Sequence, residues 1–205
     1  MRPGVPHANP KKDKKRSMQR SLIKGQSLIS TIDFLRRKGT LKKVLSRVEG
    51  SHRELFDRKL LPSTLYPVDS YTALLEGVCD VYGEDSMRVC YEIGRRVVND
   101  GLKNVYRVFL KSNSPLWVLR RSPGLWRSYH RGSDIEIVEA EKGRGKIAVI
   151  EKLQTTEAYC ETRRGGIAEA LELAGAEGLE VSHPSCRARG DGVCVFDVRW
   201  RRSPE

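Results

Sequence analysis

Hydrophobic residues recur at helical spacing through the first half of this chain. Between Ser17 and Arg37 the recurring residues are Leu22, Ile23, Leu28, Ile29, Ile32, Phe34 and Leu35. Gly39 follows them as a stop signal. From about Asp85 to Lys111, one side of a second stretch carries Met87, Cys90, Ile93, Val97, Leu102, Val105 and Phe109. Both patterns predict amphipathic helices that bury one face in a common core.

After Pro123 the pattern changes to the alternation that is typical of strands. The segment DIEIVEAEKGRGKIAVIEKL alternates on both sides of a GRG turn, which predicts a β-hairpin. EAYCETRRGGIAEALELAG returns to helical spacing, and LEVSHPSC and GVCVFDVRW flank RARGDG as a second strand pair. This order predicts an α+β fold, in which N-terminal helices pack on an antiparallel sheet of about four strands, with a helix between two β-hairpins.

The composition is that of a soluble globular protein, with 39% hydrophobic and 31% charged residues among 205. Because this length suffices for one core, we expect a single ligand-binding domain over residues 21–205. No hydrophobic run approaches the length of a membrane span, and no secretory signal opens the chain. We therefore expect a cytoplasmic protein that makes no membrane contact.

Half of the formal net charge of +12 lies at the N-terminus. Residues 1–21 contain seven Lys and Arg against Asp13 alone, which gives this segment a net charge of +6. Because residues 1–20 contain prolines and few apolar side chains, we expect a basic disordered tail. Such a segment is more often a solvated tail than a binding element. The alternative is an electrostatic arm for nucleic acid or an acidic partner.

Two cysteines and a histidine surround the last turn, in the segment SHPSCRARGDGVCVFDVRW. A turn centred on Gly190 makes Cys186 and Cys194 cross-strand partners with Cβ atoms about 5 Å apart, which suits two thiolates on one zinc ion. Pro184 interrupts the alternation after His183 and lets the imidazole turn back toward the thiols. Cys160, near the start of the preceding helix, can supply a fourth ligand. Three thiolates and one imidazole form a closed set that is typical of structural zinc.

Three other interpretations of these cysteines stay open at this level. Cys186 and Cys194 could form a hairpin disulfide, although an odd number of cysteines without a secretory signal argues against it. All three thiols could be ordinary core residues. One of them could also be a nucleophile with His183 as its base.

The C-terminal motifs resemble the 4-vinyl-reductase-like domain, a small ligand-binding module. The matching residues, within 157–200, are Cys160, the helix RRGGIAEALELAG, Cys186, the turn RARGD and the CVF at Cys194. In the phenol-sensing branch of that family, three cysteines and an acidic residue bind zinc. His183 stands at the acidic position here. The resemblance therefore implies a structural zinc site at Cys160, His183, Cys186 and Cys194, with a changed charge.

Upstream segments, among them LLPSTLYPVDSY and SPGLWRSYH, resemble myxobacterial-type proteins of unknown function. Those proteins are related to the ligand-binding fold of nitric-oxide signalling and Golgi transport. The resemblance implies a homodimer that binds a small apolar ligand between its helices and its sheet. Aromatic side chains that could line such a pocket are Tyr66, Tyr71, Trp117, Trp126 and Tyr129. For each of them, ordinary core packing is the alternative.

These observations favour a non-enzymatic sensory or regulatory module. No phosphate-binding glycine loop, nucleophile elbow or nicotinamide fingerprint is present. The YxSxR motif of haem-binding relatives is absent too, and His52 and His130 stand without a haem signature, so we do not expect haem. The alternative function is a basic module that associates with nucleic acid or another protein through the tail and the arginine-rich segment 107–127.

Overall fold

Two antiparallel sheets and the helices around them make up the computed structural model, which describes residues 21–105, 114–151 and 154–201. A four-stranded sheet has the order β4-β5-β7-β6, and a small three-stranded sheet has the order β2-β1-β3. The α+β fold expected from the sequence is confirmed. The predicted tail over residues 1–20 and the end of the second predicted helix lie outside the described residues.

The N-terminal part is mostly helical. The first sheet strand and three helices follow one another as β1 (Leu22–Lys24), α2 (Gly25–Arg37), α3 (Leu41–Leu45) and α4 (Gly50–Phe56). They are followed by β2 (Leu65–Pro67), α5 (Val68–Tyr82), the short 3-10 helix η1 (Gly83–Asp85) and α6 (Ser86–Val105). The small sheet was not predicted, because strands of two or three residues are too short to show alternation.

The C-terminal part contains the larger sheet. It runs through α8 (Pro115–Tyr129), β3 (His130–Arg131), β4 (Ser133–Glu141), β5 (Arg144–Glu151) and α9 (Glu157–Leu173). It ends with β6 (Glu177–Ser185), the 3-10 helix η2 (Arg187–Arg189) and β7 (Cys194–Arg201). The helix between two hairpins is therefore α9, as the order of patterns predicts.

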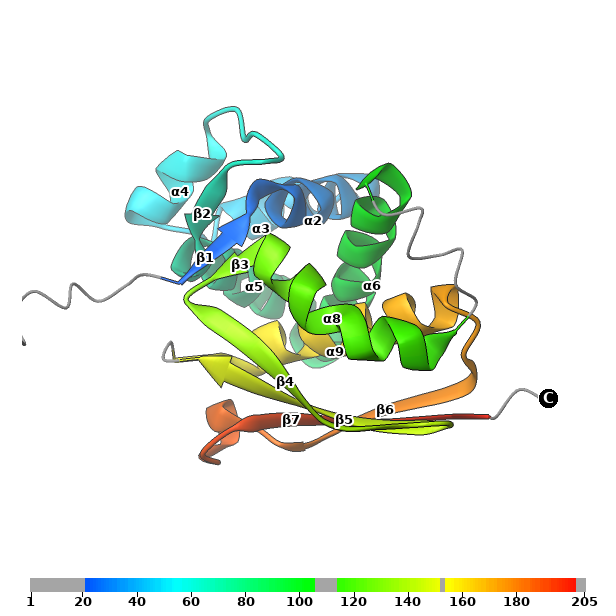
Figure 1. The fold of residues 1–205 in the computed structure, drawn as a ribbon. Coiled ribbons are helices and arrows are strands. Elements are labelled where there is room, and N and C mark those ends of the chain that lie inside the picture. The colour runs from blue at the N-terminus through cyan, green and yellow to red at the C-terminus, as the bar shows by residue number, and fades with distance from the viewer. Residues whose placement is uncertain (1–20, 106–113, 152–153, 202–205) are drawn as a thin grey trace, which may run out of the picture.

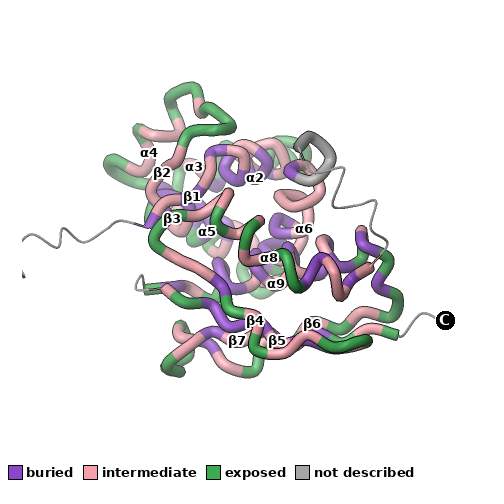
Figure 2. The backbone as a smooth tube through the Cα atoms, viewed as in Figure 1, coloured by how far each residue is buried: buried purple, intermediate pink, exposed green. Residues whose placement is uncertain are grey.

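The elements form layers (Figure 1). The larger sheet lies at the bottom of the view, α8 and α9 lie directly on one of its faces, and α2, α5 and α6 lie beyond them. Buried residues gather where these layers meet, whereas the opposite face of the sheet is largely half-buried or exposed (Figure 2). One core cluster lies among the N-terminal helices, and a second lies between the sheet and α8 and α9.

Helices α6 and α9 pack with their backbones in contact. A Cβ atom added at Gly94 of α6 would lie 1.8 Å from the carbonyl oxygen of Thr162. A Cβ atom added at Gly165 of α9 would lie 2.0 Å from the carbonyl oxygen of Tyr91. Only glycine fits at these two positions, because any side chain would separate the helices.

Helix α8 continues through Pro123, where the change of pattern suggests that helical structure ends. Proline has no backbone N–H and deprives the carbonyl four residues earlier of its donor. That carbonyl belongs to Leu119, and it accepts a hydrogen bond of 2.7 Å from the hydroxyl of Ser122 instead. The helix therefore extends to Tyr129, where it reaches the cavity described below.

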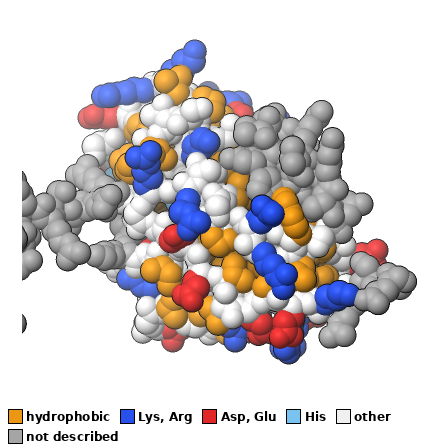
Figure 3. Space-filling model, viewed as in Figure 1, with side chains coloured by type: hydrophobic (Ala, Val, Ile, Leu, Met, Phe, Trp, Pro, Cys, Tyr) orange, Lys and Arg blue, Asp and Glu red, His pale blue; other side chains and the backbone are white. Residues whose placement is uncertain are grey.

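The face of the molecule that carries α8 mixes charged and hydrophobic side chains (Figure 3). Arg120, Arg121 and Arg127 of this helix are exposed. Within the described ranges, no helix has the length and hydrophobicity that a membrane crossing requires.

Candidate functional site

Cys160, His183, Cys186 and Cys194 meet where the start of α9 lies against the end of the β6–β7 hairpin. The first turn of α9 holds Cys160. Thr156 caps that turn, because its hydroxyl accepts a hydrogen bond from the backbone amide of Tyr159. All three thiols are at most 1% exposed.

A bulge in β6 brings His183 to the same side as the thiols. Ser182 pairs with Asp197 and Ser185 pairs with Val195, so β6 has one more residue than β7 between these pairs. In an unbroken strand, residues 183 and 186 would point to opposite faces, because strand side chains alternate. The extra residue falls at Pro184 and restores a common face. Continuing the antiparallel pairing by one residue beyond Ser185 and Val195 places Cys186 opposite Cys194.

The spacing of the ligand atoms suits a tetrahedral metal ion. The sulfur of Cys160 lies 3.7 Å from that of Cys186 and 3.8 Å from that of Cys194. Two thiolates bound tetrahedrally at the zinc–sulfur distance of about 2.3 Å are about 3.8 Å apart. The ligand atoms of all four residues, His183 included, lie within 4.8 Å of one another.

The imidazole of His183 is the strongest local indication of a missing partner. Its ring stacks on Phe196 with 4.2 Å between centroids, and both of its nitrogens are buried. Neither nitrogen has a hydrogen-bond partner within the described part of the chain. An unsatisfied buried polar group is costly, and a metal ion among the thiols would bind one of these nitrogens.

Hydrogen bonds around the thiols fix their positions and polarise them. The backbone amide of Arg187 donates to the sulfur of Cys194 at 3.4 Å, and the carboxylate of Asp191 accepts from the amide of Cys186 at 2.7 Å. A hydrogen bond from Cys160, followed by contacts with His183 and Arg187, lowers the pKa of Cys194 to about 4. The same thiol–thiol bond, together with burial, raises the pKa of Cys160. The hydrogen bonds to Cys194 thus favour its thiolate form, which is the form of cysteine that binds a metal ion.

The alternatives for these cysteines can now be compared. All five cysteines of the chain are free, and sulfur separations of 3.7 and 3.8 Å are far from a disulfide bond. A nucleophile needs access to its substrate, and these thiols are buried. Plain core packing would leave the nitrogens of His183 unsatisfied. A metal site accounts for the four residues together.

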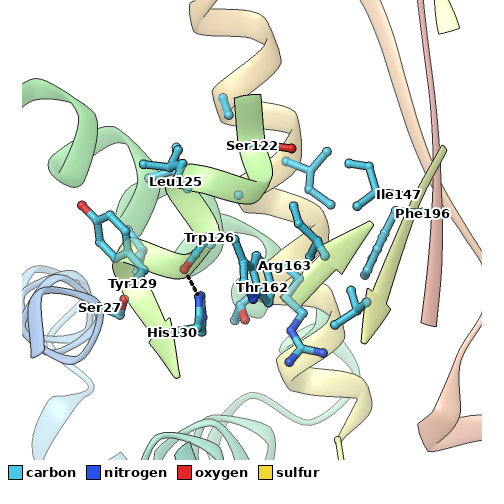
Figure 4. A pocket seen from close by; sticks show the side chains of 18 of the residues that line it. Ser27, Ser122, Leu125, Trp126, Tyr129, His130, Ile147, Thr162, Arg163 and Phe196 are labelled. Atoms are coloured by element: carbon cyan, nitrogen blue, oxygen red, sulfur yellow. Dashed lines mark hydrogen bonds between the residues drawn. The ribbon is translucent and has the colours of Figure 1, made fainter. Parts of the chain in front are cut away.

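The second candidate site is a cavity of about 170 Å³ between α6, α8, α9 and the sheet (Figure 4). In this view Ile147 and Phe196 lie on one side, and Ser27, Tyr129 and His130 on the other. Its apolar and aromatic lining residues include Ile23, Tyr71, Val97, Val98, Val118, Leu119, Leu125, Trp126, Tyr129, Ile135, Ile147, Val149, Tyr159, Ile167, Leu171 and Phe196. Phe196 belongs to both sites, because its ring also stacks on His183.

Of the aromatic residues proposed for a pocket, the cavity brings together Tyr71, Trp126 and Tyr129. Tyr66 and Trp117 lie outside its lining. Tyr66 is on β2, where its hydroxyl accepts a hydrogen bond from the amide of Leu61. Trp117 packs at the edge of the second core cluster beneath the guanidinium of Arg121.

A buried ion pair borders the cavity. Arg163 of α9 lines it and donates two hydrogen bonds to the carboxylate of Glu151, at 2.8 and 2.6 Å. Both side chains are at most 4% exposed, so the pair is desolvated but neutral as a whole. Sequence reasoning did not identify Arg163 or Glu151. The only signal was an arginine among the apolar positions of a helix, because its partner lies on another element.

His130 is also part of the cavity wall. Its ring stacks on Trp126 with 4.1 Å between centroids, and its Nδ1 lies 3.3 Å from the carbonyl oxygen of Trp126. Because a carbonyl can only accept, Nδ1 carries the proton. Burial, and then the charge of Arg163, lower the pKa of His130 to about 3, so the ring is neutral at physiological pH.

Comparison with known proteins gives a clear result for the fold. An H-NOX protein from S. oneidensis matches with a TM-score of 0.70 at 13% identity, over 89% of this chain and 98% of that one. An H-NOX protein from K. algicida matches with a TM-score of 0.69 at 10% identity, over 88% and 98% of the two chains. A third structure, which probes haem distortion in the H-NOX family, has a TM-score of 0.65 at 13% identity, over 89% and 98%.

These structures share the fold of this chain. No family model matches the sequence, and no curated protein matches it either. The resemblance to the 4-vinyl-reductase-like domain therefore stays a prediction that rests on its motifs.

The cavity does not fit a haem group. At about 170 Å³ it is close to an engineered cavity of about 150 Å³ that holds benzene, and far below the size that a porphyrin needs. Arg163, which could neutralise a propionate, is already paired with Glu151.

Proposed function

We propose that this chain, which has the fold of the H-NOX proteins, is a non-enzymatic sensory or regulatory module that binds a small, mostly apolar ligand. The ligand would occupy the cavity between α6, α8, α9 and the sheet. The observation that carries this proposal is an apolar cavity of benzene-binding size at the interface of helices and sheet. Haem is not part of it, because the cavity lacks the room.

A structural zinc ion at Cys160, His183, Cys186 and Cys194 is the second part of the proposal. It is supported by the tetrahedral spacing of the sulfurs and by the unsatisfied imidazole. Four protein ligands leave no open position, so the ion would hold the β6–β7 hairpin against α9 and would not activate water. The motif resemblance of residues 157–200 also supports zinc. The homodimer and the nucleic-acid contact remain predictions without further support.

The ligand part is tested with ethylbenzene as an apolar probe, by calorimetric titration of the full chain. We expect saturable binding. Val97→Phe fills the cavity from α6 and should abolish binding, whereas Val138→Phe, at a position that is 56% exposed, should leave it intact. If the two variants bind equally well, the ligand is not in this cavity.

The metal part is tested by metal analysis of protein purified without added zinc. We expect about one zinc per chain, which is lost in Cys186→Ser and in Cys194→Ser. Cys79→Ser is the matched control, because Cys79 lies in α5 and outside the cluster. A folded, metal-free wild type would overturn the site.

A further inference from the structure

Three polar groups in the wall of the cavity have no hydrogen-bond partner among the described residues: the hydroxyl of Tyr159, Nε of Arg163 and Nε2 of His130. The first two carry a proton that they can donate, whereas Nε2 of His130 can only accept. Nδ1 of His130 is occupied by the carbonyl oxygen of Trp126 and must carry the proton. Nε2 is therefore a bare lone pair. Within the described part of the chain no residue hydrogen-bonds to this nitrogen, although the ring lines the cavity.

The protein holds this ring firmly in place. His130 directly follows α8, and its backbone amide also donates to the carbonyl oxygen of Trp126. The indole of Trp126 stacks on the imidazole with an interplanar angle of 18°, and its N–H donates to the hydroxyl of Ser133 at 3.1 Å. A fixed ring keeps its lone pair in one direction, which is the preorganisation that a specific contact needs.

The remaining walls restrict the size and charge of the ligand. A volume of about 170 Å³ suits one six-membered ring with a small substituent. The charge of Arg163 is already balanced by Glu151, so a charged ligand would be desolvated without a counter-ion.

We propose that the cavity selects a neutral molecule with one six-membered ring and a small substituent that carries a hydroxyl or N–H group. This group would donate a hydrogen bond to Nε2 of His130. This inference rests on the proposed function and adds its selectivity. His130 is then the residue that distinguishes a hydrogen-bond donor from a purely apolar molecule of the same size.

Three probes of equal heavy-atom number test the inference by calorimetric titration of the full chain. Benzyl alcohol carries a donor, its isomer anisole carries an acceptor only, and ethylbenzene carries neither. We expect benzyl alcohol to bind about five- to tenfold more tightly than anisole, because one buried hydrogen bond is at stake. If anisole binds as tightly as benzyl alcohol, the inference fails and the proposed function stands. If none of the three binds, both fail.

His130→Phe keeps a ring beside Trp126 and removes the lone pair. We expect the preference for benzyl alcohol over anisole to fall below about twofold, while ethylbenzene still binds. His52→Phe is the matched control, since His52 contacts Ser70 away from the cavity, and it should keep the preference. A preference that survives in His130→Phe would overturn the role of His130.

A measurement on the wild type does not depend on the folding of a variant. In a long-range proton–nitrogen NMR spectrum, the Nε2 signal of His130 should move when benzyl alcohol is added. It should stay in place when ethylbenzene is added. A signal that is insensitive to bound benzyl alcohol would contradict the hydrogen bond.

Discussion

His130 lies in an environment that disfavours its charged form, and this gives stability a dependence on pH. Its pKa is about 3 in the folded chain and about 6.5 in an unfolded one. Between these values the unfolded chain binds a proton that the folded chain does not. The free energy of unfolding should therefore fall as the pH falls from about 6.5 toward 3, by at most about 1.4 kcal/mol per pH unit.

Urea unfolding of wild type and His130→Phe from neutral pH to about pH 4 measures this contribution. Other titrating groups are common to both proteins, so the difference isolates His130. We expect the variant to lose less stability on acidification than the wild type. Parallel curves for the two proteins would contradict a buried neutral imidazole.

Two buried tyrosines, Tyr71 and Tyr159, differ in the hydrogen bonding of their hydroxyl groups. The rings of Tyr71 and Tyr159 meet edge to face at 5.7 Å, and both are 2% exposed. The hydroxyl of Tyr71 shares a hydrogen bond of 3.2 Å with Thr31, whereas that of Tyr159 has no partner among the described residues. Their hydroxyls should therefore contribute differently to stability.

Tyr71→Phe should lower the free energy of unfolding by about 0.5–1.5 kcal/mol, because it removes the hydrogen bond that the Tyr71 hydroxyl donates to Thr31, whose own proton goes to the carbonyl oxygen of Ser27. Tyr159→Phe should leave it unchanged or raise it by about 1 kcal/mol, because it removes an unsatisfied polar atom. Chemical denaturation of the two variants decides the point. Equal losses would show that Tyr159 has a partner in solution.

At the scale of elements, the contact between α6 and α9 should be intolerant of any side chain. Gly165→Ala places a methyl group 2.0 Å from the carbonyl oxygen of Tyr91, so we expect a loss of about 1–3 kcal/mol or failure to fold. Gly124→Ala in α8 is the matched control. Its Cβ would meet nothing within 4 Å, and alanine favours a helix by up to about 1 kcal/mol. In thermal unfolding, the melting temperature should fall for Gly165→Ala and rise for Gly124→Ala.

The elements that the sequence predicts well are those with a long, regular pattern. The β4–β5 hairpin, α9 and the β6–β7 hairpin each carry enough alternating or helical positions to be recognised. The strands β1, β2 and β3 do not. Helix α8 was obscured by Pro123, because the hydroxyl of Ser122 compensates for the missing donor and no propensity rule records that.

The sites, too, could be predicted where their residues are close in the sequence, and could not where they depend on contacts between distant elements. Cys160, His183, Cys186 and Cys194 could be grouped from the sequence because three of them surround one hairpin. The cavity could be predicted only in part. Tyr71, Trp126 and Tyr129 were found as aromatics, but the partnership of Arg163 and Glu151 depends on how α9 lies against β5.

For the whole molecule, the position of the Cys/His cluster predicts which part would loosen on removal of the metal ion proposed to bind there. The four residues of the cluster lie on α9, on β6 and β7 and in the turn between these strands, so the proposed metal ion would join the helix to the hairpin. Hydrogen exchange with and without a strong chelator should therefore quicken at β6, β7 and the first turn of α9. Helices α2 and α5 should keep most of their protection, because only Ala158 and Tyr159 of the first turn of α9 belong to their core cluster. A uniform increase along the chain would instead indicate global unfolding.

The glycine contact between α6 and α9 also limits how the cavity can be adapted to a different ligand. The backbones of α6 and α9 already touch, so the spacing of these two helices is fixed. A different ligand would have to be accommodated by exchanging lining side chains, such as Val97 on α6 or Ile147 and Phe196 on the strands. Because the ring of Phe196 stacks on that of His183, replacing Phe196 would also disturb the packing of the proposed metal site.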